Sequence, residues 1–107
     1  MNNNITNCIN KVIEYIKQYP DKYNKLVVYG ECLDKKVENP EELNLAIGLV
    51  DNNDVYNFNL LGELLIYAND HIEYMNCTVL PISDKVVSNI EMNLILKGEI
   101  VYELKSS

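Results

Sequence analysis

The segment VVYGECLDKKVENPEELNLAIGLV, residues 27–50, decides how this chain folds. A β-branched and aromatic run ends at Gly30 and predicts a buried strand that leads into a tight turn. The charged stretch 31–41 predicts a loop with room for one irregular helical turn. Residues 43–50 predict a second strand. Two strands joined by a charged loop therefore form the centre of the expected fold.

Two helices are predicted around this centre. Residues 5–19 carry apolar side chains at helical spacing, with polar ones on the other side, so they predict an amphipathic helix that Pro20 ends. Residues 54–69 predict another helix, with Asn53 or Asp54 as its N-cap.

The C-terminal third adds three more elements. A third strand is predicted over about 72–80. Ser83 and Asp84 are expected to begin a last helix, and Gly98 is expected to end it in the C′ position. Residues 99–103 predict a short edge strand or an extended tail.

The resulting order, α-β-β-α-β-α-β, predicts an α/β (α+β) fold. We expect a small mixed sheet of about four strands with helices packed on it. At 107 residues the chain fits one domain, 1–107, without a linker or an internal repeat. A chain of this size buries only about two-thirds of its surface, so a partner or a homodimer is compatible with it.

The charge of the chain narrows the classes of ligand. The formal net charge is −7 and the sequence contains no arginine. Phosphate contacts are made by lysine and arginine, so direct nucleic-acid binding is not expected. A basic protein partner suits this charge better.

The cysteines and the lone histidine predict neither a disulfide framework nor a zinc site. Cys8, Cys32 and Cys77 are widely spaced and are expected to be buried, reduced thiols. His71 lies at a helix-to-strand junction, where an exposed or capping role is expected. The first twenty residues do not have the pattern of a signal peptide, and no apolar run is long enough to span a membrane. We therefore expect a cytoplasmic protein with no membrane association.

Polar side chains gather where the two central strands meet the loop. Successive strand residues point to opposite faces, so Glu42 and Asn44 project from the same face of the sheet. Gly30 ends the neighbouring strand, and these residues are therefore expected to converge at one edge.

This arrangement resembles the minimal nucleotidyltransferase domains of the polymerase-beta-like superfamily. Their signature is Gly-Ser, ten residues, then Asp-x-Asp, with a further carboxylate on a later strand. Here Gly30-Glu31 is followed by ten residues and then by Glu42-Leu43-Asn44. The resemblance extends over nearly the whole chain and includes the Lys97-Gly98-Glu99 ending. It implies a nucleoside triphosphate bound near Gly30 and Glu31, and Mg²⁺ held by the strand carboxylates.

The sequence departs from that signature at most of its polar positions. Glu31 stands in place of the serine, so an anion replaces a hydroxyl that would donate a hydrogen bond to phosphate. Two negative charges roughly 4–5 Å apart in water repel each other by about 1 kcal/mol. Asn44 and Asn76 stand where carboxylates are expected, and an amide oxygen is a poor ligand for a hard dication. Glu42 is the one remaining, weak metal ligand. No catalytic residue and no cofactor are therefore expected.

Three hypotheses follow. The first is a catalytically degenerate nucleotidyltransferase-like domain that acts by protein binding, and the resemblance implies a helical HEPN-like protein as its partner in a toxin–antitoxin pair. The second is an active enzyme that uses Mg²⁺ and ATP to transfer NMP to a protein or small-molecule hydroxyl, with Glu31 recruited beside Gly30 and Glu42. The third is a homodimeric structural domain without a ligand.

Overall fold

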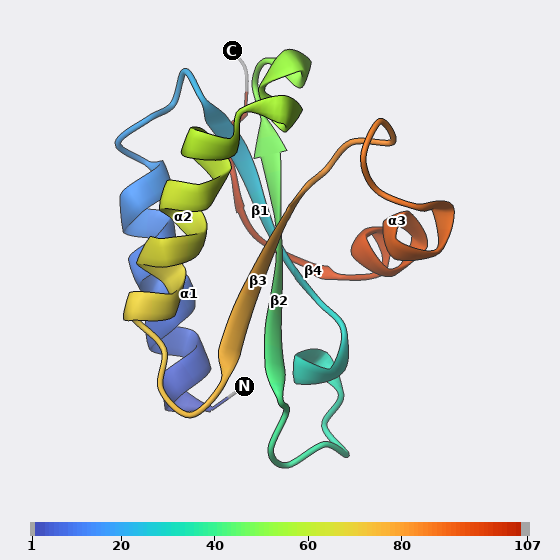
Figure 1. The fold of residues 1–107 in the computed structure, drawn as a ribbon. Helices are drawn as coiled ribbons and strands as arrows, with labels where there is room; N and C mark the ends of the chain where they lie inside the picture. The colour runs from blue at the N-terminus through green and yellow to red at the C-terminus, as the bar shows by residue number, and fades with distance from the viewer. Residues whose placement is uncertain (1, 106–107) are drawn as a thin grey trace.

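The computed structural model describes residues 2–105, and within them it confirms a mixed α+β architecture (Figure 1). The chain alternates helices and strands and includes two short 3₁₀ segments, η1 and η2. In order, its elements are α1 (Asn3–Ile16), β1 (Tyr23–Tyr29), η1 (Glu31–Leu33), β2 (Glu42–Leu49), η2 (Asn52–Tyr56), α2 (Phe58–Asp70), β3 (Asn76–Pro81), α3 (Asn89–Leu96) and β4 (Glu99–Glu103).

The four strands form one sheet in the order β3-β2-β1-β4. β1 pairs antiparallel with β2 and with β4, while β2 and β3 run parallel. The parallel pair follows from the connection, because α2 carries the chain back along the sheet before β3 begins. The segment 99–103 is therefore an edge strand, one of the two forms that the sequence predicts.

Two helices cover one face of the sheet and the third covers the other (Figure 1). The inner side of α1 and α2 packs on alternate residues of β2, namely Leu43, Leu45 and Ile47, all fully buried. On the opposite face, Ala46 joins a smaller apolar cluster with Val87 and Ile95. Each strand of the central pair thus buries both of its faces, as its continuous apolar run predicts.

The second helix begins later than the sequence predicts. Neither Asn53 nor Asp54 is its N-cap, because both lie within η2, which the Asp51 side chain caps by accepting a hydrogen bond from the Asn53 amide. The N-cap of α2 is Asn57, whose side chain accepts from the Leu60 amide at 3.0 Å. Several Asn and Asp residues in succession offer competing caps, and packing selects among them.

The last helix is also shorter than predicted. Ser83 and Asp84 do not begin it: Ser83 is buried, its hydroxyl donates to Asn52 at 3.1 Å, and its carbonyl closes a single turn with Val87. Ser88, which has an extended backbone, is the N-cap of α3.

The third strand starts at residue 76 rather than 72, because the chain first makes a turn in which Tyr74 adopts a φ of +65°. The side-chain oxygen of Asn4 accepts a hydrogen bond from the Glu73 amide at 3.0 Å and so ties this turn to α1.

Gly98 follows the last helix as predicted, but its role is close approach rather than a left-handed cap. A Cβ at Gly98 would lie 2.5 Å from the carbonyl oxygen of Val28. The absence of a side chain therefore allows the chain leaving α3 to meet β1 and continue as β4.

Candidate functional site

The sequence-predicted site residues come together at one end of the sheet, on the face that α3 covers. Asn44 of β2 lies opposite Tyr29 of β1, and Gly30 follows directly. In the parallel pair Glu42 lies opposite Asn76. The convergence of Gly30, Glu42 and Asn44 that strand alternation predicts is therefore present, and Asn76 joins them.

Gly30 is required by the way the chain leaves β1. Its φ of +89° and ψ of −154° fall in a region that residues with a side chain rarely adopt. A Cβ here would also lie 2.6 Å from the Nδ2 atom of Asn44. Gly30 thus makes room for a side chain of the neighbouring strand, in addition to allowing the turn.

Asn44 is held by a residue that the sequence reasoning missed. The hydroxyl of Thr78 donates a hydrogen bond to the Oδ1 atom of Asn44 at 2.8 Å, and the two residues lie opposite each other in the β2–β3 register. Thr78 follows Asn76 by two positions, so both project from the same face. That spacing was a usable signal, but the register that matches Thr78 to Asn44 is a property of the folded sheet.

Glu31 is engaged within its own loop. One of its carboxylate oxygens accepts a hydrogen bond from the backbone N–H of Glu41 at 2.7 Å. This contact joins the two ends of the ten-residue loop between Gly30-Glu31 and Glu42. The Glu31 carboxylate therefore has a structural function in closing the loop.

Negatively charged carboxylates lie close to Tyr29 at this site. Tyr29 is buried beneath it, and burial raises the pKa of its hydroxyl. The negative charges of Glu91, on α3, and of Glu42 raise this pKa further. Glu91 is a second residue that sequence reasoning missed, since only the packing of α3 brings it to this face.

These residues do not fit a two-metal centre. Glu42 is the one carboxylate among Glu42, Asn44 and Asn76, and the oxygen of the Asn44 amide already accepts the Thr78 hydroxyl. Within residues 2–105, no three His, Cys, Asp or Glu side chains gather closely enough to hold a metal ion. Magnesium at a phosphate-transfer site takes carboxylate oxygens, which balance its charge.

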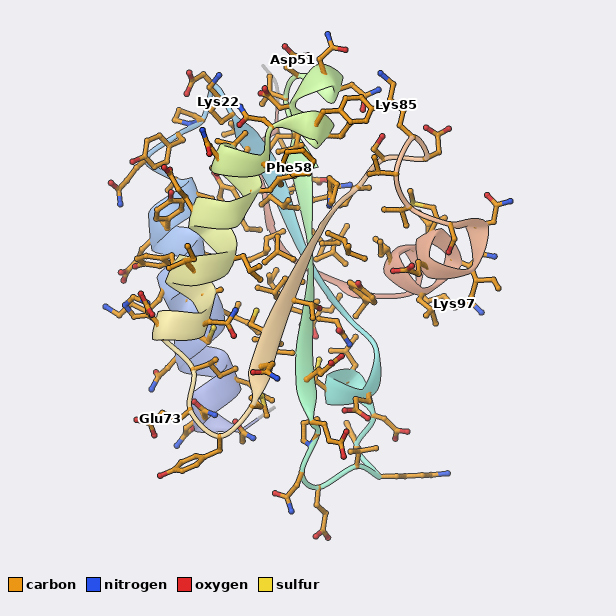
Figure 2. All side chains as sticks on the ribbon, viewed as in Figure 1. Lys22, Asp51, Phe58, Glu73, Lys85 and Lys97 are labelled. Atoms are coloured by element: carbon orange, nitrogen blue, oxygen red, sulfur yellow. The ribbon has the colours of Figure 1, made fainter. Side chains whose placement is uncertain are left out.

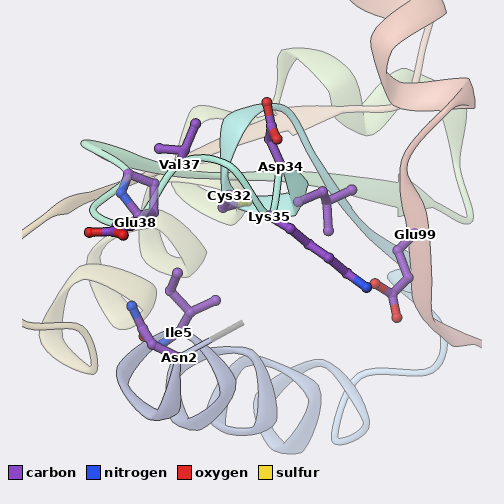
Figure 3. A pocket seen from close by; sticks show the side chains of 10 residues that line it. Asn2, Ile5, Cys32, Asp34, Lys35, Val37, Glu38 and Glu99 are labelled. Carbon is purple, nitrogen blue, oxygen red and sulfur yellow. The ribbon is translucent and has the colours of Figure 1, made fainter.

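A cavity of about 570 Å³ lies on the other side of the loop, between η1, the start of α1 and the start of β4 (Figure 3). Its wall mixes apolar residues such as Ile5 with side chains of both charges, and Lys35 extends across it toward Glu99. None of Gly30, Glu42, Asn44 and Asn76 lines it. The cavity is therefore separate from the motif residues.

The cysteines and the histidine lie where the sequence predicts. All three thiols are free and buried. The Nδ1 atom of His71 lies 2.8 Å from the carbonyl oxygen of Tyr67, one turn before it at the end of α2, and the two rings stack with centroids 4.3 Å apart. His71 thus caps the helix. No helix within residues 2–105 combines the length and the apolar character needed to cross a bilayer.

No protein-family model matches the chain, and no curated protein matches it significantly.

Proposed function

We propose that this protein is a nucleotidyltransferase-like domain that does not perform metal-dependent nucleotidyl transfer and that acts by binding another protein. The main support for the proposal is that polar atoms at the motif positions already form hydrogen bonds within the fold. The Asn44 oxygen accepts the Thr78 hydroxyl, and a Glu31 oxygen accepts the Glu41 amide. Groups that in the signature would face phosphate and metal are here hydrogen-bonded within the fold.

The charges around the motif support the same proposal. Glu31, Glu42 and Glu91 contribute negative charge on or beside this end of the sheet. A nucleoside triphosphate is itself highly negative, so such a surface repels it unless cations offset the negative charge. The sequence provides few cations: it has nine lysines, no arginine and a net charge of −7.

The charge and the exposed apolar surface of the domain support binding to another protein. The net charge suits a basic partner, and large apolar side chains are exposed on both α2 and α3. The resemblance to minimal nucleotidyltransferase domains implies a HEPN-like helical protein as the class of partner. We place this pairing in the cytoplasm, where the three free thiols stay reduced.

Titration calorimetry with ATP in the presence of Mg²⁺ tests the proposal. We expect no binding in the micromolar range by the natural chain. The triple variant Glu31→Ser, Asn44→Asp, Asn76→Asp restores the charges of the signature and serves as the control, in which Mg²⁺-dependent ATP binding is expected to rise. Micromolar, metal-dependent binding by the natural chain that vanishes in Glu42→Ala would refute the proposal and favour the active enzyme.

A further inference from the structure

We propose that the exposed face of α2 is the docking surface, and that it binds a basic amphipathic helix of the partner protein. This inference rests on the proposed function and specifies where and how the partner is bound. The α2 surface is defined by Phe58, Gly62, Leu65 and Ile66, which recur at helical spacing.

The first argument is that α2 is apolar on two sides. Leu64 and Ala68 on its inner side are fully buried. On its outer side Phe58 is 84% exposed, Ile66 64% and Leu65 38%. A surface helix normally presents polar residues to water, and a helix that is apolar all round is normally buried. The outer side of α2 therefore has the composition of a covered face.

The second argument is the glycine in the middle of this face. A Cβ added at Gly62 would meet no atom within 4 Å, so nothing in the described chain requires a glycine there. Glycine is also a poor helix former. Because the glycine between Phe58 and Ile66 has no side chain, the backbone of a second helix can approach α2 closely there.

The third argument is a shallow, open groove of about 300 Å³ that adjoins the α2 surface and shares Ile66 with it. Across the groove from α2 stands Tyr15 of α1, whose ring centroid lies 4.7 Å from that of Tyr67. Two exposed carboxylates, Glu63 and Asp70, also line it, and neither forms an ion pair with any of residues 2–105. Aromatic rings beside free carboxylates suit a lysine or arginine side chain, through cation–π and ionic contacts.

The distribution of charge favours α2 over the other exposed apolar helix. Between residues 37 and 84 the sequence has no lysine or arginine, and α2 lies within this segment. Lys22, which pairs with Asp54 at 4.0 Å, is a cation at the Phe58 end (Figure 2). On the α3 side, by contrast, Lys97 directly follows the helix as its C-cap (Figure 2). A basic helix is therefore attracted to the α2 surface rather than to α3.

The test measures the binding of a synthetic amphipathic peptide of leucine and lysine by fluorescence anisotropy, with the full-length protein at physiological salt. A scrambled peptide of the same composition, which cannot form an apolar face, is the reference ligand. We expect the amphipathic peptide to bind more tightly than the scrambled one, because both have equal charge and differ only in their apolar face.

Ile66→Asp is the critical variant, because it adds negative charge while it removes an apolar contact. If binding were merely electrostatic, this variant would bind the basic peptide more tightly, whereas docking on the α2 surface predicts a loss of about tenfold. Ile90→Asp is the matched control: Ile90 of α3 is 76% exposed, and the substitution changes the charge equally on the opposite face. No loss is expected there.

Gly62→Gln excludes unfolding as the cause of any loss. Because Gly62 has open space around it and glutamine is a good helix former, this variant is expected to melt at a higher temperature. It is also expected to bind the peptide about tenfold more weakly, since its side chain fills the approach to the α2 surface.

Besides the absence of peptide binding, three results would overturn the inference. They are unchanged or tighter binding by Ile66→Asp, a loss confined to Ile90→Asp, and a dimer of the protein alone that Ile66→Asp dissociates, which would assign the surface to a second copy. The calorimetry with ATP separates this inference from the proposed function. Nucleotide binding refutes the function and leaves the surface standing, whereas absence of peptide binding refutes the surface and leaves the function standing.

Discussion

Substituting Gly30 by alanine tests whether this residue and Asn44 form one structural unit. The new methyl group would occupy a backbone conformation, φ +89° and ψ −154°, that costs about 1–3 kcal/mol for a residue with a side chain. It would also lie 2.6 Å from the Asn44 amide nitrogen and displace that side chain from Thr78. Loss of one such hydrogen bond costs about 1 kcal/mol. We expect the free energy of unfolding to fall by about 2–4 kcal/mol.

A double-mutant cycle separates the two contributions. In an Asn44→Ala background the hydrogen bond to Thr78 is already absent and the contact with a new methyl group is relieved. Only the backbone cost of Gly30→Ala then remains. The same substitution should therefore cost about 1 kcal/mol less than in the natural chain.

Urea denaturation followed by circular dichroism measures these differences, provided that the slope against denaturant is the same in all four proteins. Gly62→Ala is the matched control, because its methyl group meets no atom within 4 Å, and it should raise stability by about 1 kcal/mol. Additivity of the two substitutions within about 0.5 kcal/mol would show that Gly30 and Asn44 are independent, and would refute the reasoning.

Two further predictions concern the thiols and the turn before β3. Cys8, Cys32 and Cys77 should react with Ellman's reagent only as fast as the protein unfolds, because all three thiols are buried. Burial also raises the pKa of Cys32, and the hydrogen bond with Cys8, followed by burial, raises that of Cys77. A thiol that reacts in native buffer at its rate in urea would contradict this. Tyr74→Gly should raise stability by about 0.5–1 kcal/mol in thermal melts, because the side chain is 99% exposed and φ is +65°. Tyr56→Gly, at a position where φ is not positive, should lower the stability. An equal loss of stability at both positions would show that the backbone of Tyr74 is not strained.

Local patterns in the sequence were sufficient to place every helix and strand, but not their ends. The apolar spacing of residues 5–19 indicates α1, and the run before Gly30 indicates β1. The helix starts were wrong where several capping residues compete, as at Asn53 and Asn57, or at Ser83 and Ser88. A side chain that can cap a helix does so only where the following residues also pack.

The site, too, was only partly predictable from the sequence. Strand alternation alone places Glu42 and Asn44 on one face, and the loop length brings Gly30 beside them. The hydrogen bond from Thr78 to Asn44 and the charge of Glu91 near Tyr29 were not predictable, because they depend on the parallel register of β3 and on the packing of α3. Neither is recorded in the spacing of residues along the chain.

The sequence by itself determined the alternation of helices and strands, the negative charge, and the presence of amide side chains at positions 44 and 76. These are properties of residue type and of short-range periodicity, which any conformation of the chain retains. Only the tertiary structure decided which polar atoms of the motif find partners, and that α2, already packed on the sheet through one side, also exposes apolar side chains on the other. Such relations depend on contacts between residues distant in sequence, and those contacts exist only once the sheet has formed.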